Sequence, residues 1–269
     1  MSNTDSLSSI PWWVVTDLDG TLMDHAYNWE PAREAICRLQ SQGIPVIPCT
    51  SKTAEEVACF RDEAGLRDPY IVENGGAVHG QTGDGEPWEL ALGCSVMELR
   101  PVLQELAHLL KEPLQPIDAL SDQQALDLLG LQGEALRLAC RRRWSLPFVP
   151  PSAPARQRLP DLAKRLGFAV VQGNRLGHLL GAEVSKGRAL EVLKQRCGGS
   201  PVRVLALGDS PNDLPLLEAG DVSVVVPGVN GPHPVFADAL AQGRYQLAPA
   251  CHAQGWAEAV FQHVLNAQC

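Results

Sequence analysis

The 269-residue sequence predicts an α/β protein with an open parallel sheet of the Rossmann type and an inserted α+β domain. Three observations predict this fold. Apolar strands alternate with helical patterns up to residue 84, the alternation is interrupted over 85–182, and it resumes over 183–269. Strand–helix alternation is typical of parallel βαβ units. We therefore expect a discontinuous core, 1–84 with 183–269, and an inserted domain at 85–182.

The first part of the core contains three short apolar runs that predict strands. Pro31 opens the first helix, because proline is favoured in a first helical turn, and Gly43 closes it. The remaining elements expected here are strands at 12–15, 44–49 and 70–72 and a helix at about 53–64.

The inserted segment shows longer amphipathic patterns and a turn signal. Gly173-Asn174 separates two apolar runs and predicts a hairpin. The proline-rich stretch 147–160 predicts a broken segment without a regular helix. The other elements expected are helices at 95–111, 122–129 and 134–143 and the hairpin strands at 168–171 and 176–180.

The second part of the core returns to the α/β alternation. Its expected elements are helices at 186–196, 213–219 and about 255–266 and strands at 202–207 and 222–226.

Composition limits the partners and the compartment. Twenty-two basic and 31 acidic residues give a net charge of −9, which argues against binding to nucleic acid or to an anionic membrane. No apolar run approaches the roughly 20 residues that span a bilayer. Eight cysteines without a C-x-x-C pair, in a chain with no secretory signal pattern, predict reduced thiols and a cytoplasmic protein. No oligomeric state is predicted.

Polar residues follow three of the predicted strands directly: Asp17 with Asp19, Thr50 with Ser51, and Asp209 with Asp213. The carboxyl ends of parallel strands share one edge of a sheet, where ligands bind. Four carboxylates at one edge would repel each other and require a cation, and hard oxygen ligands favour Mg²⁺. A phosphorylated small molecule is therefore a compatible substrate despite the negative charge of the chain.

Asp17-Leu18-Asp19 divides two carboxylates between two tasks. As the chain leaves the strand, one carboxylate and the next-but-one carbonyl can face a metal, which leaves the other carboxylate for proton transfer. An Asx-turn or helix N-cap is the structural alternative. A calcium loop does not fit, because Gly20 arrives too early and the twelfth position is Asn28.

Three further positions have both a structural and a chemical interpretation. Thr50 and Ser51 either cap the next helix or form an anion site at its N-terminus. Lys186 begins a helix, against the helix macrodipole, and is either solvated or compensated by an anion. Asp213 is either a helix cap or part of the acidic cluster.

These residues carry a family resemblance. Asp17-Leu18-Asp19-Gly20-Thr21-Leu22, Thr50, Lys186 and Gly208-Asp209-x-x-Asn212-Asp213 resemble, in order, the four motifs of the haloacid-dehalogenase-like phosphatases. The chain is most similar to the mannosyl-3-phosphoglycerate phosphatase family within them. The residues that carry this closer resemblance lie at 44–53, 72–77, 144–148, 175–179 and 255–260. The family usually has Asp before the motif-three lysine, where this chain has Ser185.

The resemblance implies a phosphatase mechanism. Asp17 would attack phosphorus and form an aspartyl-phosphate, and Asp19 would act as general acid and then as general base. Asp17, the Asp19 carbonyl and Asp209 would hold Mg²⁺, with Asp213 and Asn212 orienting its outer shell. The phosphoryl oxygens would be held by Thr50, Ser51 and Lys186.

The resemblance also implies that the inserted domain is a cap that closes over the substrate and excludes water. The candidate substrate-binding residues are Asn74, Arg142, Ser145, Arg175 and His178. Arginine suits bidentate carboxylate recognition. The structural alternatives are a solvated helix face for Arg141–Arg143 and a satisfied hairpin side chain for His178.

The expected substrate is mannosyl-3-phosphoglycerate, whose dephosphorylation yields a compatible solute. Glucosyl-3-phosphoglycerate, sucrose phosphate or another sugar phosphate would use the same chemistry. Two other interpretations are a receiver-like module, in which the aspartyl-phosphate is a signal, and a mutase that keeps the phosphate. Asp19 and the inserted domain argue against the receiver-like module.

Overall fold

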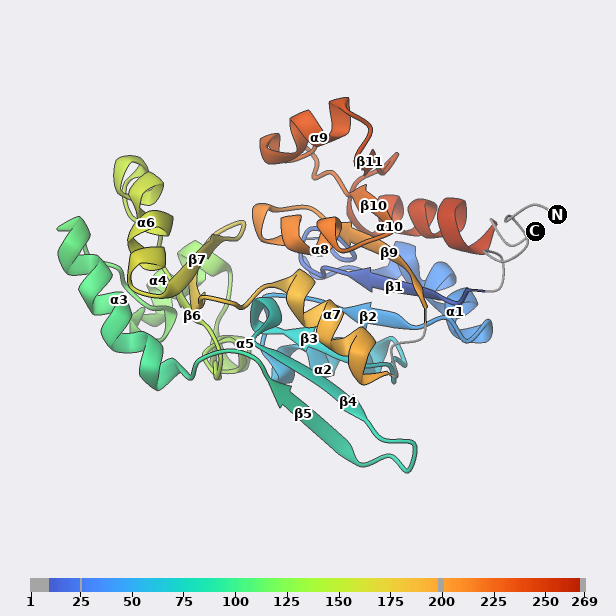
Figure 1. The fold of residues 1–269 in the computed structure, drawn as a ribbon, viewed down its shortest axis with the longest axis horizontal. Helices are drawn as coiled ribbons and strands as arrows, with labels where there is room; N and C mark the ends of the chain where they lie inside the picture. Colours follow the sequence, from blue (N-terminus) through green and yellow to red (C-terminus); the bar gives the residue numbers. More distant parts are fainter. Residues whose placement is uncertain (1–9, 25, 198–200, 267–269) are drawn as a thin grey trace.

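The computed structural model describes residues 10–24, 26–197 and 201–266. A five-stranded parallel sheet forms the core (Figure 1). Its strands run in the order β11 (Gln246–Leu247), β10 (Val222–Val225), β9 (Arg203–Gly208), β1 (Trp12–Thr16) and β2 (Val46–Pro48). Val14 of β1 pairs with Val46 on one side and with Leu205 on the other. The predicted open parallel α/β sheet is confirmed.

Helices cover both faces of this sheet. Val14 packs in one apolar cluster with α1 (Arg33–Ser41) and α10 (His252–Val260). Val15 packs in the opposite cluster with α7 (Lys186–Arg196) and α8 (Leu214–Glu218). Burial on both faces explains why the core strands are continuous apolar runs and do not alternate with polar residues.

A three-stranded antiparallel sheet adjoins the parallel one. It contains β3 (Tyr70–Val72), β4 (Ala77–Gln81) and β5 (Pro87–Ala91). The expected strand at 70–72 exists, but its ladder partner is antiparallel, and a single bridge from Ile71 to Cys49 joins it to the parallel series. The β4–β5 hairpin was not expected, and residue 85 lies in its turn.

A second antiparallel sheet lies in the inserted segment, apart from the core in Figure 1. Its order is β6 (Leu146–Phe148), β8 (Gly177–Gly181) and β7 (Phe168–Gln172), and the predicted β7–β8 hairpin is confirmed. Leucines of α3 (Val96–Leu110) and α6 (Ala153–Arg165) form an apolar cluster with Leu146 and Leu179. The segment also contains α4 (Asp122–Leu129) and α5 (Gly133–Ala139). This second antiparallel sheet and its helices form the α+β cap of the fold.

The expected broken segment at 147–160 is wrong, because strand β6 and helix α6 occupy most of it. Ala155, Leu159 and Ala163 recur at helical spacing and are buried. Pro154 lies in the first turn, where its missing N–H costs nothing, and Pro160 is exposed. Packing of the apolar stripe therefore outweighs the prolines.

Several element boundaries also differ from expectation. The helix expected at 134–143 ends at Ala139, whose carbonyl accepts a hydrogen bond from Arg142 Nε at 2.7 Å. The final helix begins at His252, earlier than expected, and continues as a π-helical turn over Phe261–Leu265. Helix α2 (Ala54–Glu63) was expected. Helix α9 (Ala237–Ala241) and strand β11 were not expected, as was the case for the β4–β5 hairpin. Within the described ranges, no helix is long and apolar enough to cross a membrane.

Candidate active site

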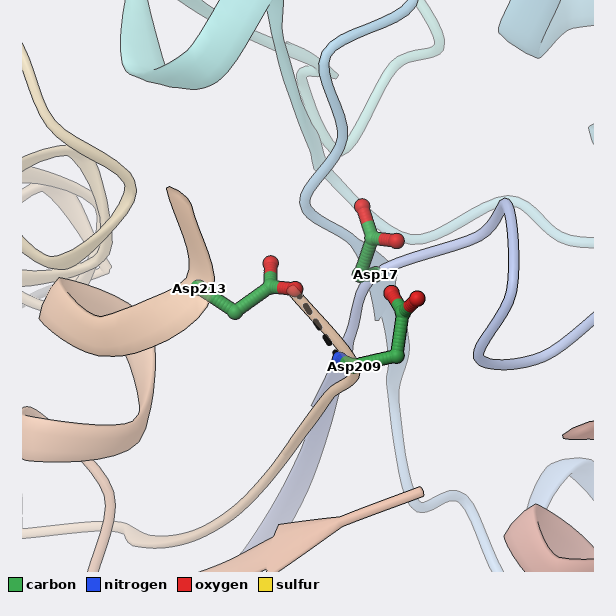
Figure 2. A group of neighbouring side chains, drawn as sticks. All are labelled: Asp17, Asp209 and Asp213. Carbon is green, nitrogen blue, oxygen red and sulfur yellow. Dashed lines mark hydrogen bonds between the residues drawn. The ribbon is translucent and has the colours of Figure 1, made fainter. Parts of the chain in front are cut away.

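Three carboxylates converge at the carboxyl edge of the parallel sheet. Asp17 follows β1, Asp209 follows β9, and Asp213 ends the short turn Pro211–Asp213 (Figure 2). One oxygen from each lies within 4.8 Å of the others. Asp17 and Asp213 are buried and Asp209 is half-buried. The sheet topology thus joins residues that are far apart in the sequence, as the strand-end pattern predicted.

Lys186 pairs with two of these carboxylates. Its Nζ lies 2.6 Å from Asp17 Oδ1 and 2.6 Å from Asp213 Oδ1, and the lysine side chain is fully buried. Burial alone would lower the pKa of Lys186, but Asp17 and Asp213 raise it above its ordinary value. The solvated alternative for Lys186 is therefore wrong. Ser185 caps helix α7 by accepting the Arg188 N–H.

Asp213 serves two structural purposes at once. Its Oδ2 accepts the backbone N–H groups of Asp209 and Ser210, both at 3.0 Å, and the first of these bonds is dashed in Figure 2. Its other oxygen accepts from Lys186. Asp213 therefore caps the turn that carries Asp209 and also belongs to the charged cluster.

Asp209 is held by two side chains and by a close approach of the chain. Thr21 Oγ1 donates to its Oδ1 and Asn174 Nδ2 to its Oδ2, both at 3.0 Å. A Cβ on Gly20 would lie 2.4 Å from Asp209 Oδ2 and would displace that carboxylate, and φ at +89° also favours glycine there. Burial and the Asp213 charge raise the pKa of Asp209 to about 7.

This cluster fits a hard divalent cation. Three carboxylates face one lysine, so the buried group carries an excess of negative charge. All the donors are oxygens, which suits Mg²⁺ chemistry, and a bound cation would favour the ionised form of Asp209. The sheet edge at which a metal was predicted therefore offers three carboxylates that could bind a divalent cation, those of Asp17, Asp209 and Asp213.

Asp19 lies beside the acidic cluster but is not one of its three members. Its Oδ2 lies 2.9 Å from Lys52 Nζ, whereas its Oδ1 is buried and has no hydrogen-bond partner. The side chain is 37% exposed and lines a cavity together with Asp17. The two carboxylates of the Asp-Leu-Asp motif therefore occupy different surroundings.

The cavity measures about 890 Å³, part of it open to solvent, and lies between the sheet edge and the cap. The predicted site residues that line it are Asp17, Asp19, Ser51, Arg142, Arg175, His178 and Asn212. Those that lie outside its lining are Thr50, Asn74, Ser145, Lys186, Asp209 and Asp213.

Neither Thr50 nor Ser51 caps the following helix. The N-cap of α2 is Thr53, which exchanges hydrogen bonds with Glu56 in a capping box. The Thr-x-x-Glu spacing is the signal that identifies this cap in the sequence. Thr50 is fully buried, and its Oγ1 accepts the Lys52 N–H at 3.2 Å.

The two candidate arginines of the cap already have protein partners. Arg142 donates to the carbonyls of Ser51 and Ala139 and lies 3.5 Å from Glu56 Oε2. Its side chain is only 9% exposed, so the solvated-face alternative is wrong for Arg142. Arg175 donates to the Leu129 carbonyl.

His178 is buried at the cavity wall, and its Nδ1 has no hydrogen-bond partner. Burial, with the charges of Arg142 and Lys186, lowers its pKa to about 3. His178 is therefore neutral at physiological pH. The alternative of a satisfied hairpin side chain does not hold for Nδ1.

Ser145 and Asn74 contact other protein groups. Ser145 Oγ donates to Glu73 Oε2 at 2.7 Å, and the same carboxylate accepts the backbone N–H groups of Arg143 and Trp144. Asn74 Oδ1 accepts from Asn212 Nδ2 at 2.9 Å, while its own Nδ2 has no partner. Glu73 therefore ties the start of β6 to the core.

Sequence reasoning missed several residues of the site. Lys52, next to Ser51, is the partner of Asp19, and only its position beside that pair hinted at a role. His252 Nδ1 lies 2.9 Å from the Gly20 carbonyl, and no local pattern marks this distant residue. The other residues missed are Thr21, Tyr27, Glu56, Glu73 and Asn174.

Comparisons with known proteins agree with this geometry. Residues 14–87 and 152–241 match the family of haloacid dehalogenase-like hydrolases. The chain is 31% identical over 232 residues to a glucosyl-3-phosphoglycerate/mannosyl-3-phosphoglycerate phosphatase of Persephonella marina. The aligned region covers 81% of this chain and 85% of the relative.

Solved structures show the same fold at low sequence identity. A haloacid dehalogenase-like hydrolase from Bacteroides thetaiotaomicron superposes with a TM-score of 0.66 at 20% identity, covering 94% of this chain and 99% of that one. The sucrose-phosphatase of Synechocystis, solved with sucrose and phosphate, gives 0.62 at 18% identity, with 94% and 98% covered. Protein 0175 of Thermoplasma acidophilum gives 0.68 at 17%, with the same coverage of 94% and 98%.

Proposed function

This chain belongs to the haloacid dehalogenase-like hydrolases, as a phosphatase homologous to the glucosyl-3-phosphoglycerate/mannosyl-3-phosphoglycerate phosphatases, and we propose that it dephosphorylates mannosyl-3-phosphoglycerate. The product, mannosylglycerate, would serve as a compatible solute. The observation that carries the proposal is the position of Asp17, which lines the cavity and pairs with Lys186 at 2.6 Å.

The first step is attack by Asp17 on the substrate phosphorus. One carboxylate oxygen of Asp17 forms the bond to phosphorus while the bond from phosphorus to the leaving oxygen breaks. Asp19 gives its proton to that oxygen, so the alcohol leaves neutral. Lys186 adds positive charge where the transferred phosphoryl group is most negative.

The second step returns the enzyme to its starting state. Asp19, now a carboxylate, takes a proton from water, whose oxygen attacks phosphorus and breaks its bond to Asp17. Inorganic phosphate is released. Thr50 and Ser51 are proposed to hold phosphoryl oxygens in both steps, and Thr50 Oγ1 accepts an N–H, which leaves its own proton for donation.

Mg²⁺ would be held by Asp17, the Asp19 carbonyl and Asp209, with Asp213 and Asn212 orienting its outer shell. When bound, it would supply positive charge to the phosphoryl oxygens. Thr21 and Asn174 already fix the Asp209 carboxylate, which presets its orientation for a ligand.

We propose that the cap side of the cavity selects the glycosylglycerate. His178 offers an unpaired buried ring nitrogen there, and Arg142 and Arg175 place positive charge near the substrate carboxylate. Ser145 and Asn74 would support the site indirectly: Ser145 donates a hydrogen bond to Glu73, and Asn74 accepts one from Asn212. Glucosyl-3-phosphoglycerate is the second candidate substrate, because the name of the Persephonella relative includes both sugars.

The decisive experiment measures phosphate release from mannosyl- and glucosyl-3-phosphoglycerate, sucrose phosphate and simple hexose phosphates, with Mg²⁺ and with EDTA. We expect a clear preference for the glycosylglycerates that requires the metal. Equal rates on every substrate would overturn the substrate assignment, and unchanged activity in EDTA would overturn the metal role. Transfer of phosphate without its release would indicate a mutase.

The covalent step has its own test. Asp17→Asn should abolish turnover while the far-UV circular dichroism spectrum stays that of the wild type. Full hydrolysis by this variant would show that Asp17 is not the nucleophile.

A further inference from the structure

Lys52 lies between helix α2 and the loop after β1 that carries Asp19, at the wall of the cavity. We call the loop after β1 the catalytic loop. Its Nζ is 2.9 Å from Asp19 Oδ2 and 3.8 Å from Glu56 Oε1. The Tyr27 ring lies beneath the ammonium group, with its centroid 4.5 Å away. Only 11% of the lysine side chain is exposed, so its position is fixed on three sides.

The charge of Lys52 is stable in this position. Burial would lower its pKa, but Asp19 and Glu56 raise it above the ordinary value. A permanent ammonium group therefore faces Asp19, and it uses only one of the two carboxylate oxygens. The other oxygen, Oδ1, is buried and has no partner.

We propose that Lys52 is a positioning residue for Asp19: by holding Oδ2 it fixes the orientation of the carboxylate at the cavity wall, beside the place where the leaving oxygen of the substrate would lie. This inference rests on the proposed function, in which Asp19 transfers protons. An acid that must serve both a leaving oxygen and a water molecule gains from a fixed orientation, because a misplaced catalytic group slows the reaction steeply.

The support of Lys52 extends to the cap. Glu56, its second carboxylate neighbour, lies 3.5 Å from Arg142, and Arg142 also donates to the Ser51 carbonyl. The chain of charges Asp19–Lys52–Glu56–Arg142 therefore runs from the catalytic loop to the cap. The geometry of Asp19 depends in this way on a residue that belongs to the cap.

A direct substrate contact is the competing role for Lys52. As an anchor for the phosphate or carboxylate, Lys52 would act in binding, and its removal would raise KM. As a positioning residue, Lys52 acts in proton transfer, and its removal lowers kcat. The need for proton transfer depends on the leaving group, since a 4-nitrophenolate leaves without protonation whereas an alkoxide does not.

The experiment compares Lys52→Met with wild type on 4-nitrophenyl phosphate and on the best alkyl phosphate of the substrate panel. We expect kcat for the alkyl phosphate to fall about 100-fold, the range of a general acid, with a change of about threefold or less for 4-nitrophenyl phosphate. Lys52→Arg should restore most of the alkyl activity. Lys194→Met is the matched control, because it removes a lysine whose 2.8 Å ion pair with Glu191 lies on helix α7.

A double-mutant cycle tests whether Lys52 acts through Asp19. Asp19→Asn and the double variant Asp19→Asn/Lys52→Met should have the same kcat for the alkyl phosphate, because nothing remains for Lys52 to position. Multiplied losses in the double variant, or a raised KM with unchanged kcat in Lys52→Met, would overturn the proposal. A wild type inactive on every phosphomonoester would instead overturn the proposed function, and this inference with it.

Discussion

Lys186 Nζ lies 2.6 Å from Asp17 Oδ1, and less than a tenth of either side chain is exposed. The lysine makes an equal contact with Asp213, so one cation serves two buried carboxylates. Removing it leaves two buried carboxylates without the cation that compensates their charge.

Lys186→Met should therefore destabilise the protein as well as inactivate it. Loss of one partner from a buried ion pair costs about 3–5 kcal/mol of unfolding free energy. Urea denaturation followed by circular dichroism measures this loss. Arginine at the same position keeps the charge and serves as the comparison. A loss below about 1 kcal/mol in Lys186→Met would contradict the pairing.

Mg²⁺ should stabilise the folded protein in the absence of substrate. A ligand at 100 times its Kd adds about 2.7 kcal/mol to the free energy of unfolding, which raises Tm by roughly 5–10 °C in a chain of this size. Differential scanning calorimetry with and without MgCl₂ measures the shift. Asp209→Asn should lose it, and a rise in Tm that this variant retains would place the ion elsewhere.

Gly20→Ala and Gly85→Ala form a matched pair, because both glycines have φ at +89°. Nothing lies within 4 Å of a Cβ at Gly85, so alanine there should cost only the backbone strain of about 1 kcal/mol. At Gly20 the Cβ would collide with Asp209.

Because alanine at position 20 would displace the Asp209 carboxylate, we expect Gly20→Ala to bind Mg²⁺ about 10-fold more weakly than wild type. Gly85→Ala should bind Mg²⁺ with wild-type affinity. Isothermal titration calorimetry distinguishes the two. Equal affinities would show that Gly20 is not needed for the geometry of Asp209.

His178 should make the protein sensitive to acid. Its pKa is about 3 in the folded protein and about 6.5 when unfolded, so between these values only the unfolded chain takes up the proton. Stability from this residue is complete above pH 6.5 and falls as the pH is lowered towards 3, by about 2 kcal/mol at pH 5.

His178→Gln removes that proton uptake. The drop in unfolding free energy between pH 7 and pH 5, measured with urea, should be about 2 kcal/mol smaller than in wild type. His108→Gln, at an exposed position of α3, is the control. An unchanged drop in His178→Gln would mean that His178 is protonated in the folded protein.

The sequence predicted the core of the site because its signals are local. Asp17 and Asp209 directly follow apolar strands, and parallel strands bring their ends to one edge whatever separates them in the chain. For Lys186 the helix start left two alternatives, a solvated side chain or one compensated by an anion, because a cation there is unfavourable alone. Its partners, Asp17 and Asp213, come from two other segments of the chain and are visible only in the fold.

The remaining contacts depend on tertiary packing that no local pattern records. Strand β5 pairs with β4, but its residues alternate between exposed and half-buried positions, so its sequence lacks the apolar run that predicted the core strands. Glu73 reads as a loop residue, yet its carboxylate fastens β6 to the core. Lys52 meets Asp19 only once α2 and the first loop are placed side by side. Arg142 and Ser145 were predicted as substrate contacts from resemblance, whereas their partners became visible only in the fold.

The pairing of β1 with β9 has a consequence for the newly made chain. Trp12 pairs with Arg203, so the ribosome must deliver the whole cap before β1 gains its second neighbour. Until then one edge of β1, which is apolar on both faces, stays open to other nascent strands. Synthesis of this protein therefore includes an interval of exposure to aggregation, which ends only when the second part of the core emerges.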